Sequence, residues 1–221
     1  MRGAKPKQYL KLRGRALIEY GINVFMQTAW VEGIVVVLSP GDEEFAKLGI
    51  ARHWKLHTAT GGATRAESVL AGLQKVGELD AKKTTPAVPP FVLIHDAARP
   101  CLMRDDLERL RSEASDDQGG LLAIPVADTL KRAEAAHAAA TVDRRDLWRA
   151  QTPQMFRLGL LQQALGDCVT QGIEVTDEAR AMEAAGHRPH LVAGQISNIK
   201  VTYPDDLALA EFWLERMESG R

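Results

Sequence analysis

The sequence predicts a Rossmann-like α/β fold, in which helices flank a mostly parallel sheet. Short apolar runs rich in β-branched residues recur along the chain, as is typical of strands buried on both faces. Stretches with helical periodicity separate these runs, and strands that alternate with helices favour parallel pairing. A chain of 221 residues can bury one good core, so we expect a single domain over 1–221.

The strands are the clearest predicted elements. The run at 34–38 is continuously apolar and stops at Ser-Pro-Gly, and the run at 91–94 stops directly at His-Asp. In chain order, we expect strands at 34–38, 56–59, 91–94, 121–126 and 198–202.

Amphipathic stretches predict helices between the strands. Two apolar faces have helical spacing: Leu17, Gly21, Val24 and Phe25 on one, and Val69, Leu73 and Val76 on the other. A final helix is expected after Thr-Tyr-Pro-Asp at 202–205, which has capping-box spacing and a proline in the first turn.

One polar, alanine-rich segment, 127–145, interrupts this alternation. It lies between the run at 121–126 and the pair Leu147-Trp148, and it fits an excursion from the core, such as an arm that meets a partner subunit. By composition it fits a solvated loop with a short helix equally well. Both interpretations stay open at this point.

Composition excludes several classes of function. The 28 basic and 29 acidic residues give a net charge of −1, which does not favour a nucleic-acid or membrane-surface partner. No apolar run approaches the ~20 residues that span a bilayer, and the basic N-terminus has no apolar core of a signal peptide. The two cysteines, Cys101 and Cys168, suit buried thiols in a reducing compartment. We therefore expect a cytoplasmic protein that binds any anionic ligand through local cations.

Polar residues gather where predicted strands end, which is where open α/β sheets bind ligands. The run at 91–94 leads into Asp96, suited to a hard cation or a sugar hydroxyl, and Arg99, suited to a phosphate. A plain Asp–Arg ion pair that orders the loop is the alternative. We interpret His95 as structural, because nothing near it has metal-ligand spacing.

A second candidate site follows the strand at 56–59. Gly61 and Gly62 let the backbone approach a flat ligand closely, so that N–H and C=O groups can read a base edge, although an ordinary turn also fits. Ala63 follows them, and Ser68 lies in the next helix.

Other candidates are ambiguous when taken singly. Lys200, inside the predicted strand 198–202, either reaches the surface or meets an anion, and Lys7 lies in a basic leader. Four more residues lie in or beside strand-to-loop regions, where caps and surface positions are common: Thr129, Arg144, Thr152 and Thr176.

Taken together, the motifs resemble one family, the 2-C-methyl-D-erythritol 4-phosphate cytidylyltransferases, over almost the entire chain. They are PKQYL (6–10), GG-x-x-R-x-x-SV-x-x-GL (61–73), HDAARPC (95–101), PVADTLK (125–131), TVDR-x-x-LW-x-AQTPQ-x-F (141–156), TDEA (176–179) and NIKVT-x-P-x-DLALAE (198–211). HDAARP alone is moderately specific, whereas the ordered set is highly specific. The resemblance implies a homodimeric α/β enzyme of isoprenoid precursor synthesis. It would use CTP and Mg²⁺, with the arm at 127–145 shared between subunits.

The resemblance also implies roles for the candidate residues. Lys7 and Lys200 would be catalytic and neutralise the CTP phosphates, and Asp96 would lie near the metal and the ribose. The other roles fall into three groups: Gly61, Gly62, Ala63 and Ser68 on cytosine; Arg99, Thr152 and Thr176 on the acceptor, together with Asp96 and Lys200; and Thr129 and Arg144 reaching into the partner's site.

The sequence departs from the family at its start. Family members open with a buried strand and an Ala-Ala-Gly-rich loop carrying an arginine, and then a methionine that leads to PKQY. Met1 occupies the place of that methionine. The comparison therefore implies that a strand and a phosphate loop are missing, and that this chain binds CTP weakly. Two other functions stay open: a ribitol 5-phosphate cytidylyltransferase, and a nucleotide-binding dimer without activity. The segments TVDR and AQTPQ favour methylerythritol phosphate.

Overall fold

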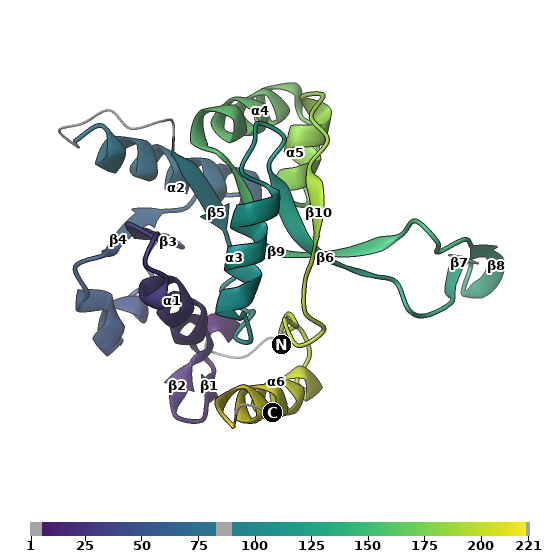
Figure 1. Ribbon diagram of the computed structural model, residues 1–221, viewed down its shortest axis with the longest axis horizontal. Coiled ribbons are helices and arrows are strands. Elements are labelled where there is room, and N and C mark those ends of the chain that lie inside the picture. Colours follow the sequence, from purple (N-terminus) through teal and green to yellow (C-terminus); the bar gives the residue numbers. More distant parts are fainter. Residues whose placement is uncertain (1–5, 83–89, 220–221) are drawn as a thin grey trace.

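The computed structural model describes residues 6–82 and 90–219, which form a mixed α/β fold (Figure 1). Its helices are α1 (Leu17–Gln27), α2 (Arg65–Asp80), α3 (Arg104–Glu113), α4 (Leu158–Gln171), α5 (Glu178–Ala184) and α6 (Asp205–Glu218). Short 3₁₀ turns lie at η1 (Lys7–Tyr9), η2 (Phe45–Lys47) and η3 (Gly49–Arg52). The strands are β1 (Lys11–Leu12), β2 (Arg15–Ala16), β3 (Ile34–Leu38), β4 (Leu56–Thr60), β5 (Phe91–Ile94), β6 (Gly120–Pro125), β7 (Leu130–Glu134), β8 (His137–Val142), β9 (Trp148–Arg157) and β10 (His190–Ala193).

The central sheet has four strands in the order β10-β6-β9-β5. β10 and β6 run parallel, but β9 is antiparallel to both β6 and β5. A second sheet pairs β3 with β4 in parallel. The prediction of a mostly parallel sheet is therefore confirmed only in part, because three of the four central strands run in one direction but two of the three ladders between them are antiparallel. The reason is β9, a ten-residue strand that returns from the 127–145 excursion and enters the sheet against the direction of its neighbours.

A hollow of about 840 Å³ separates the two sheets. Residues 35–37 of β3 and 91–94 of β5 line it, together with apolar side chains of α1 and α2. Within the described residues, β3 pairs only with β4 and β5 pairs only with β9, so each has an edge without a strand partner. Figure 1 shows β3 and β4 set apart from β5. Arg65, Ser68, His95 and Asp96 also line this hollow.

Most predicted strands are confirmed, at β3, β4, β5 and β6. The strand expected at 198–202 is wrong. That segment has no regular secondary structure, and within the described residues one backbone–backbone hydrogen bond joins it to a distant part of the chain, from Val201 N to the carbonyl of Ala98. Its neighbour is a loop rather than a strand, so no ladder can form. The strand that completes this edge is β10, which the sequence reading did not identify.

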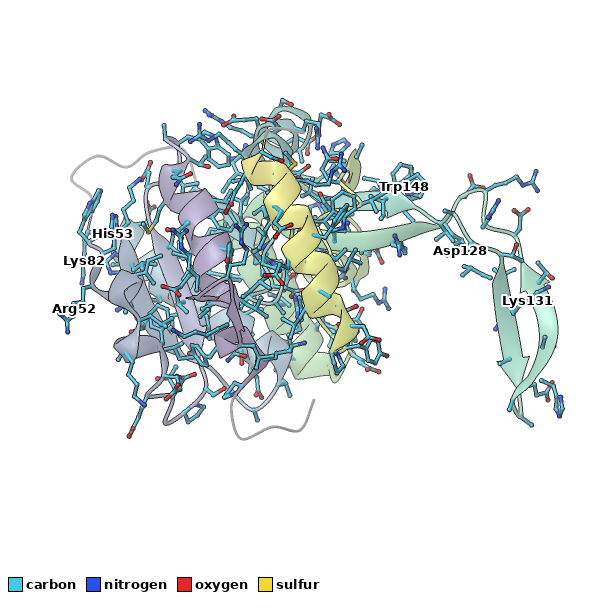
Figure 2. All side chains as sticks on the ribbon, turned by 90° about the horizontal axis from the view of Figure 1, so that it is seen from below. Arg52, His53, Lys82, Asp128, Lys131 and Trp148 are labelled. Carbon is cyan, nitrogen blue, oxygen red and sulfur yellow. The ribbon has the colours of Figure 1, made fainter. Side chains whose placement is uncertain are left out.

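The segment 127–145 forms an antiparallel hairpin of β7 and β8 that projects from the body of the protein (Figure 1). Figure 2 shows Asp128 and Lys131 on this hairpin, well away from the core, with Trp148 at its base. The interpretation as a solvated loop with a short helix is therefore wrong. A protruding arm is present, and its contact with a second subunit remains a prediction.

The helices pack as their apolar faces predict. Leu17, Gly21 and Phe25 of α1 are buried, as is Leu73 of α2, and the centre of the core is formed by α4 and α5 packed on the sheet around Phe156. Thr64 caps α2 in a reciprocal pair with Glu67. Cys101 and Cys168 are buried free thiols, as expected. No helix within 6–82 or 90–219 is long and apolar enough to cross a membrane.

Candidate active site

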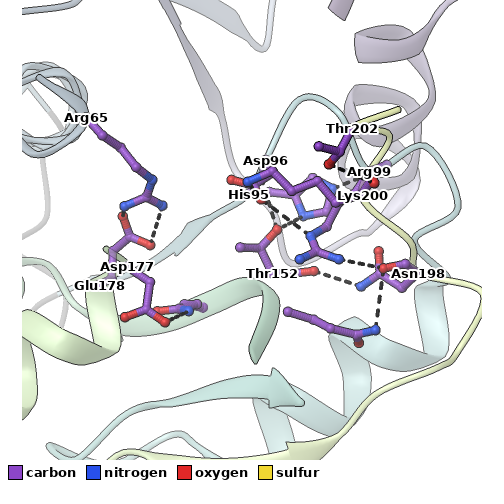
Figure 3. A network of polar contacts seen from close by, with 12 residues as sticks. Arg65, His95, Asp96, Arg99, Thr152, Asp177, Glu178, Asn198, Lys200 and Thr202 are labelled. Atoms are coloured by element: carbon purple, nitrogen blue, oxygen red, sulfur yellow. Dashed lines mark hydrogen bonds and ion pairs between the residues drawn. The ribbon is translucent and has the colours of Figure 1, made fainter. Parts of the chain in front are cut away.

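A charged cluster forms where β5 ends. The loop after β5 carries Asp96 and Arg99, and the segment before α6 brings Lys200 against them (Figure 3). Lys200 Nζ lies 2.9 Å from Asp96 Oδ2, and Arg99 Nε lies 3.4 Å from the same oxygen. The Lys200 side chain is 45% exposed, whereas those of Asp96 and Arg99 are largely buried. Two cations therefore share one carboxylate, and Asp96 itself lines the hollow.

The charges in this cluster are unevenly balanced. Burial acts to raise the pKa of Asp96, but the hydrogen bond from Lys200 and the charges of Lys200 and Arg99 outweigh it, so the pKa is lowered. Burial lowers the pKa of Arg99, partly offset by Asp96. With Asp96 ionised, one positive charge of the three groups stays uncompensated. A site with that surplus attracts an anionic ligand.

Buried hydrogen bonds fix the segment that carries Lys200. Asn198, which is fully buried, donates from Nδ2 to the carbonyl of Thr152 at 2.8 Å. Its own carbonyl accepts from Arg99 Nη1 at 2.7 Å, and Gln151 Nε2 donates to the carbonyl of Gln195 at 2.9 Å. Residues 195–200 are thus anchored on β9 and on the Arg99 side chain, which restricts where Lys200 can lie.

Thr152 and His95 lie directly behind Asp96. The Asp96 N–H donates to Thr152 Oγ1 at 3.0 Å. His95 contacts the same hydroxyl through Nδ1 at 3.0 Å and the carbonyl of Arg99 through Nε2 at 3.2 Å. Burial lowers the pKa of His95 to about 4, so the ring is neutral near pH 7.

The glycine loop between β4 and α2 is shaped by close approach. A Cβ on Gly61 would come within 2.7 Å of Ser68 Oγ, and one on Gly62 within 2.4 Å of Glu67 Cβ. Only glycine fits both positions, so the backbone folds tightly over the first turn of α2. Ser68 donates its hydroxyl to the carbonyl of Thr64 at 2.9 Å. The outcome is a short stretch of accessible backbone beside the hollow that also contains Asp96.

A second polar network ties the glycine loop to α5 (Figure 3). Arg65, the first residue of α2, binds the buried carboxylate of Glu178 in a bidentate pair, at 2.7 and 3.0 Å. Gln154 of β9 donates to Asp177 Oδ2 at 3.0 Å and accepts from the Ala179 N–H at 2.8 Å. The start of α5, which follows Thr176, is therefore held against both α2 and β9.

Comparison with known proteins identifies the family. The family model described as 2-C-methyl-D-erythritol 4-phosphate cytidylyltransferase matches residues 1–216. The enzyme of that name from Klebsiella pneumoniae is 48% identical over 214 residues, which is 96% of this chain and 86% of the relative. The one from Yersinia pestis is 47% identical over 217 residues, or 97% and 86%. The chain belongs to this family.

Solved structures of the cytidylyltransferase family share the fold. A 4-diphosphocytidyl-2C-methyl-D-erythritol synthase superposes with a TM-score of 0.84 at 41% identity, covering 94% of both chains. The Francisella tularensis 2-C-methyl-D-erythritol 4-phosphate cytidylyltransferase gives a TM-score of 0.81 at 32% identity, covering 96% of this chain and 94% of that one. The resemblance stated from the motifs is thereby confirmed at the level of family and fold.

The structure brings some of the predicted site residues together and keeps others apart. Asp96, Arg99, Thr152 and Lys200 form one connected cluster, and Ser68 lines the same hollow as Asp96. The remaining candidates lie on separate elements: Lys7 on η1, Gly61, Gly62 and Ala63 before α2, Thr176 before α5, and Thr129 and Arg144 at the two ends of the hairpin. Arg144 donates to the carbonyl of Ala127, which braces the base of the hairpin.

Lys200 lies in a segment that has the side-chain alternation of a strand without strand pairing. Its place inside a paired strand is wrong, because 198–202 has no ladder partner in the described structure. The expected alternation of side chains nevertheless holds, since Val201 is fully buried while Lys200 is exposed. The contacts of Asn198 with Thr152 and with Arg99 hold this segment in place of a ladder.

Sequence reasoning missed several residues that organise the site. Arg65, Glu178 and Asn198 all lie within the recognised motifs, yet none was assigned a role. The one sequence feature that could have drawn attention to them is that each is a charged or amide residue inside a recognised motif that also contains apolar residues. Their partners are 113 and 46 positions away in sequence, so no local pattern reveals the pairing.

Proposed function

We propose that this protein transfers the cytidylyl group of CTP to 2-C-methyl-D-erythritol 4-phosphate. The products are CDP-methylerythritol and pyrophosphate, in the synthesis of isoprenoid precursors. Family membership over residues 1–216 carries the proposal. The cluster of Asp96, Arg99 and Lys200, with its surplus positive charge, supports it physically because both substrates are phosphates.

The reaction depends more on positioning of the two substrates than on acid–base catalysis. The acceptor's phosphate oxygen attacks the α-phosphorus of CTP in line with the departing pyrophosphate, forming one P–O bond as the other breaks. A phosphate monoester has a second pKa of about 6, so at pH 7 it is largely dianionic and needs no strong base. The protein must hold two polyanions together and neutralise charge as it develops.

The cationic side chains divide this work. Lys200 and Lys7 neutralise the phosphates of CTP, and Arg99 contacts the acceptor phosphate. Lys200 suits a moving charge because its ammonium is half-exposed and restrained by a single carboxylate, Asp96. Arg99 suits a fixed contact because its guanidinium is largely buried and bonded to the carbonyl of Asn198.

Cytosine is read mainly by backbone at the glycine loop. Gly61, Gly62 and Ala63 offer main-chain N–H and C=O groups at the surface, and Ser68 supports the loop from α2. Ala63 has no polar side chain, so recognition there falls to the main chain. The tight packing of Gly61 and Gly62 on α2 supports this role, since a rigid loop reads a base edge without an ordering cost.

The residues present fit a magnesium ion held jointly with substrate. Both described contacts of the Asp96 carboxylate go to Oδ2, which leaves Oδ1 for a cation. Mg²⁺ is commonly bound by one or two carboxylates together with substrate phosphates, and one carboxylate suffices here. Such an ion would neutralise the phosphates and orient them.

The acceptor pocket is completed by a second copy of the chain. Thr176 immediately precedes Asp177, which accepts a hydrogen bond from Gln154, and this supports its role in the acceptor pocket. Thr129 and Arg144 sit on a hairpin that projects away from their own active site, so they would reach the partner's (Figure 1). Large apolar side chains, Leu147 and Trp148, are exposed at the base of this hairpin and favour burial against a partner.

We place the protein in the cytoplasm, which the buried, unpaired thiols of Cys101 and Cys168 support. A role as a nucleotide-binding dimer without activity is disfavoured by family membership over residues 1–216.

The choice of acceptor is tested by competition. Equal amounts of 2-C-methyl-D-erythritol 4-phosphate and ribitol 5-phosphate are incubated with CTP and Mg²⁺, and the two CDP-linked products are separated by mass. We expect the methylerythritol product to dominate. A dominant ribitol product would reassign the protein to the ribitol 5-phosphate enzymes, and CTP binding without either product would favour the inactive dimer.

A further inference from the structure

For a neutral His95 ring, the positions of the hydrogen atoms behind Asp96 follow from the contacts. His95 Nε2 lies 3.2 Å from the carbonyl oxygen of Arg99, which can only accept. Nε2 must therefore carry the ring hydrogen. In a neutral imidazole the other nitrogen is then an acceptor, so His95 Nδ1 receives a hydrogen bond from Thr152 Oγ1, 3.0 Å away.

In this assignment, the only hydrogen of the Thr152 hydroxyl is donated to His95 Nδ1 and is not available to a ligand. The same oxygen accepts the Asp96 N–H at 3.0 Å, so the hydroxyl both donates and accepts inside the protein. The residue is only 4% exposed. A threonine that lined the acceptor pocket would instead turn a free hydroxyl toward the ligand. Its contacts here all lead to Asp96 and to the residues around it.

The main-chain carbonyl of Thr152 holds the segment that carries Lys200, the partner of Asp96 in the ion pair. Its carbonyl accepts from Asn198 Nδ2 at 2.8 Å, and Asn198 lies two residues before Lys200. Thr152 therefore binds the Asp96 backbone through its side chain and the Lys200 segment through its carbonyl (Figure 3). One residue of β9 thus contacts both segments that meet in the 2.9 Å contact between Lys200 and Asp96.

Packing holds the His95 ring in the required orientation. Its edge meets the ring of Phe25 at 5.5 Å between centroids and 68° between planes. A Cβ on Gly21 would lie 3.3 Å from His95 Cδ2, so the absence of a side chain at that position leaves room for the ring. A ring fixed in this way acts as a stationary acceptor for Thr152.

We propose that Thr152 and His95 are positioning residues that set Asp96 and Lys200 relative to each other, and that the Thr152 hydroxyl does not bind the acceptor. This inference rests on the proposed function only in giving Asp96 and Lys200 a role in cytidylyl transfer. It revises the expectation that Thr152 lines the acceptor pocket.

The test separates the hydroxyl from the shape of the side chain. Thr152→Val keeps the shape and removes the hydroxyl, whereas Thr152→Ser keeps the hydroxyl. Loss of the hydroxyl leaves the Asp96 N–H and His95 Nδ1 unpaired, so we expect kcat to fall by about tenfold to a hundredfold while the KM of the acceptor changes less than about threefold. Thr152→Ser should recover at least about a third of kcat because it restores both hydrogen bonds. Thr170→Val, on the exposed face of α4, is the matched control.

Three outcomes would overturn the proposal. A rise of about tenfold or more in the acceptor's KM with kcat retained in Thr152→Val would show a direct contact with the substrate. Unchanged kinetics in Thr152→Val would remove the positioning role. Equal losses in Thr152→Val and Thr152→Ser would show that a hydroxyl at this position does not restore kcat, and would remove its two hydrogen bonds as the cause.

A measurement without turnover keeps this test separate from the proposed function. Long-range ¹H–¹⁵N correlation spectra of the ¹⁵N-histidine-labelled protein report which nitrogen of His95 carries hydrogen. We expect the Nε2–H tautomer in the wild type and a shifted Nδ1 resonance in Thr152→Val, because that nitrogen loses its donor. If the wild type transfers no cytidylyl group but shows this tautomer, the proposed function fails while the hydrogen-bond assignment stands. The Nδ1–H tautomer, or an Nδ1 resonance that does not move in Thr152→Val, would overturn the assignment itself.

Discussion

Lys200 combines exposure with restraint, which is the combination expected of a group that stabilises developing charge. Its ammonium contacts Asp96 at 2.9 Å, yet nearly half of the side chain is open to a ligand. We expect Lys200→Met to lower kcat by about a hundredfold to a thousandfold, because it removes one preorganised charge from the reacting phosphates. Steady-state kinetics and thermal unfolding together check this. A lower Tm with undiminished kcat would make Lys200 a structural partner of Asp96.

Tyr9 anchors the turn that carries Lys7. Its side chain is 2% exposed, and its hydroxyl donates to Asp42 Oδ2 at 2.8 Å. Burial, and then the bond to Asp42, raise the pKa of Tyr9 well above its ordinary value of 10.0. The folded state therefore keeps this proton at a pH where the unfolded chain loses it.

The free energy of unfolding should decrease at high pH because of Tyr9. Because the folded state binds more protons above pH 10, stability is fully present below that pH and decreases above it, by up to about 1.4 kcal/mol per pH unit from this group. Urea unfolding of wild type and Tyr9→Phe between pH 9 and 11 isolates the effect. We expect the two proteins to converge in free energy of unfolding as the pH rises. A constant difference across this range would contradict the account.

At the residue scale, site residues with a local sequence signal could be predicted, whereas those that depend on long-range contacts could not. Asp96 and Arg99 were recognised as candidates because they follow a buried strand directly. The use of Thr152 and Asn198 was not foreseeable, since these residues lie 56 and 99 positions from their partners on the Asp96 loop. Short-range spacing carries no information on such pairs.

The projecting hairpin gives the main prediction at the scale of elements. Thr129 and Arg144 lie on an arm that points away from its own active site, so their loss should act on the partner's acceptor site. A charge-assisted bond to phosphate contributes roughly 1.5–3 kcal/mol, so we expect Arg144→Ala to raise the acceptor's KM about tenfold to a hundredfold. The KM of CTP should change much less, and Arg145→Ala, next to it on the same arm, serves as the control.

Mixed dimers test whether the arm acts across subunits. Heterodimers of Arg144→Ala and Lys200→Met would contain one site in which neither defect is present, if each arm serves its neighbour. Activity should then recover in the mixture relative to either variant alone. Heterodimers that form but show no recovery would mean that each subunit is self-sufficient.

The hollow between β3 and β5 gives a second prediction at this scale. Both strands line it, and within the described residues neither has a ladder partner on that side. An apolar strand placed there would pair with both edges and bury the surrounding side chains of α1 and α2. We expect fusion of such a strand and an Ala-Ala-Gly-x-Gly-x-Arg loop ahead of Pro6 to raise both Tm and CTP affinity. A fused strand of alternating lysine and valine is the control, and equal effects of the two fusions would contradict a specific strand site.

Element prediction succeeded where the chemistry of a segment is uniform. The continuous apolar runs at β3 and β5 could be recognised without any partner. β9 could not, because Trp148–Arg157 mixes Arg, Gln, Thr and Pro with apolar residues, and its burial comes from neighbours on both sides. The hairpin at 127–145 was ambiguous for the opposite reason, since its exposed alanines fit a helix as well as a strand.

At the scale of the whole molecule, a nearly neutral protein must bind two polyanions. The net charge of −1 supplies no long-range attraction, so binding depends on local cations such as Arg99 and Lys200. The fold makes this possible by bringing together segments from about residue 96 and about residue 200 at the end of one strand. Family membership assigns the reaction, and this arrangement accounts for it physically.

The central claim is that an oxygen of the acceptor phosphate attacks the α-phosphorus of CTP on this protein. The most direct measurement uses 2-C-methyl-D-erythritol 4-phosphate with ¹⁸O in its phosphate group, CTP and Mg²⁺, and follows the label by mass. The chain as printed and the strand-fused form are both assayed. The account predicts CDP-methylerythritol that retains all of the label, together with unlabelled pyrophosphate. Label in the pyrophosphate, or no CDP-methylerythritol from either form, would contradict it.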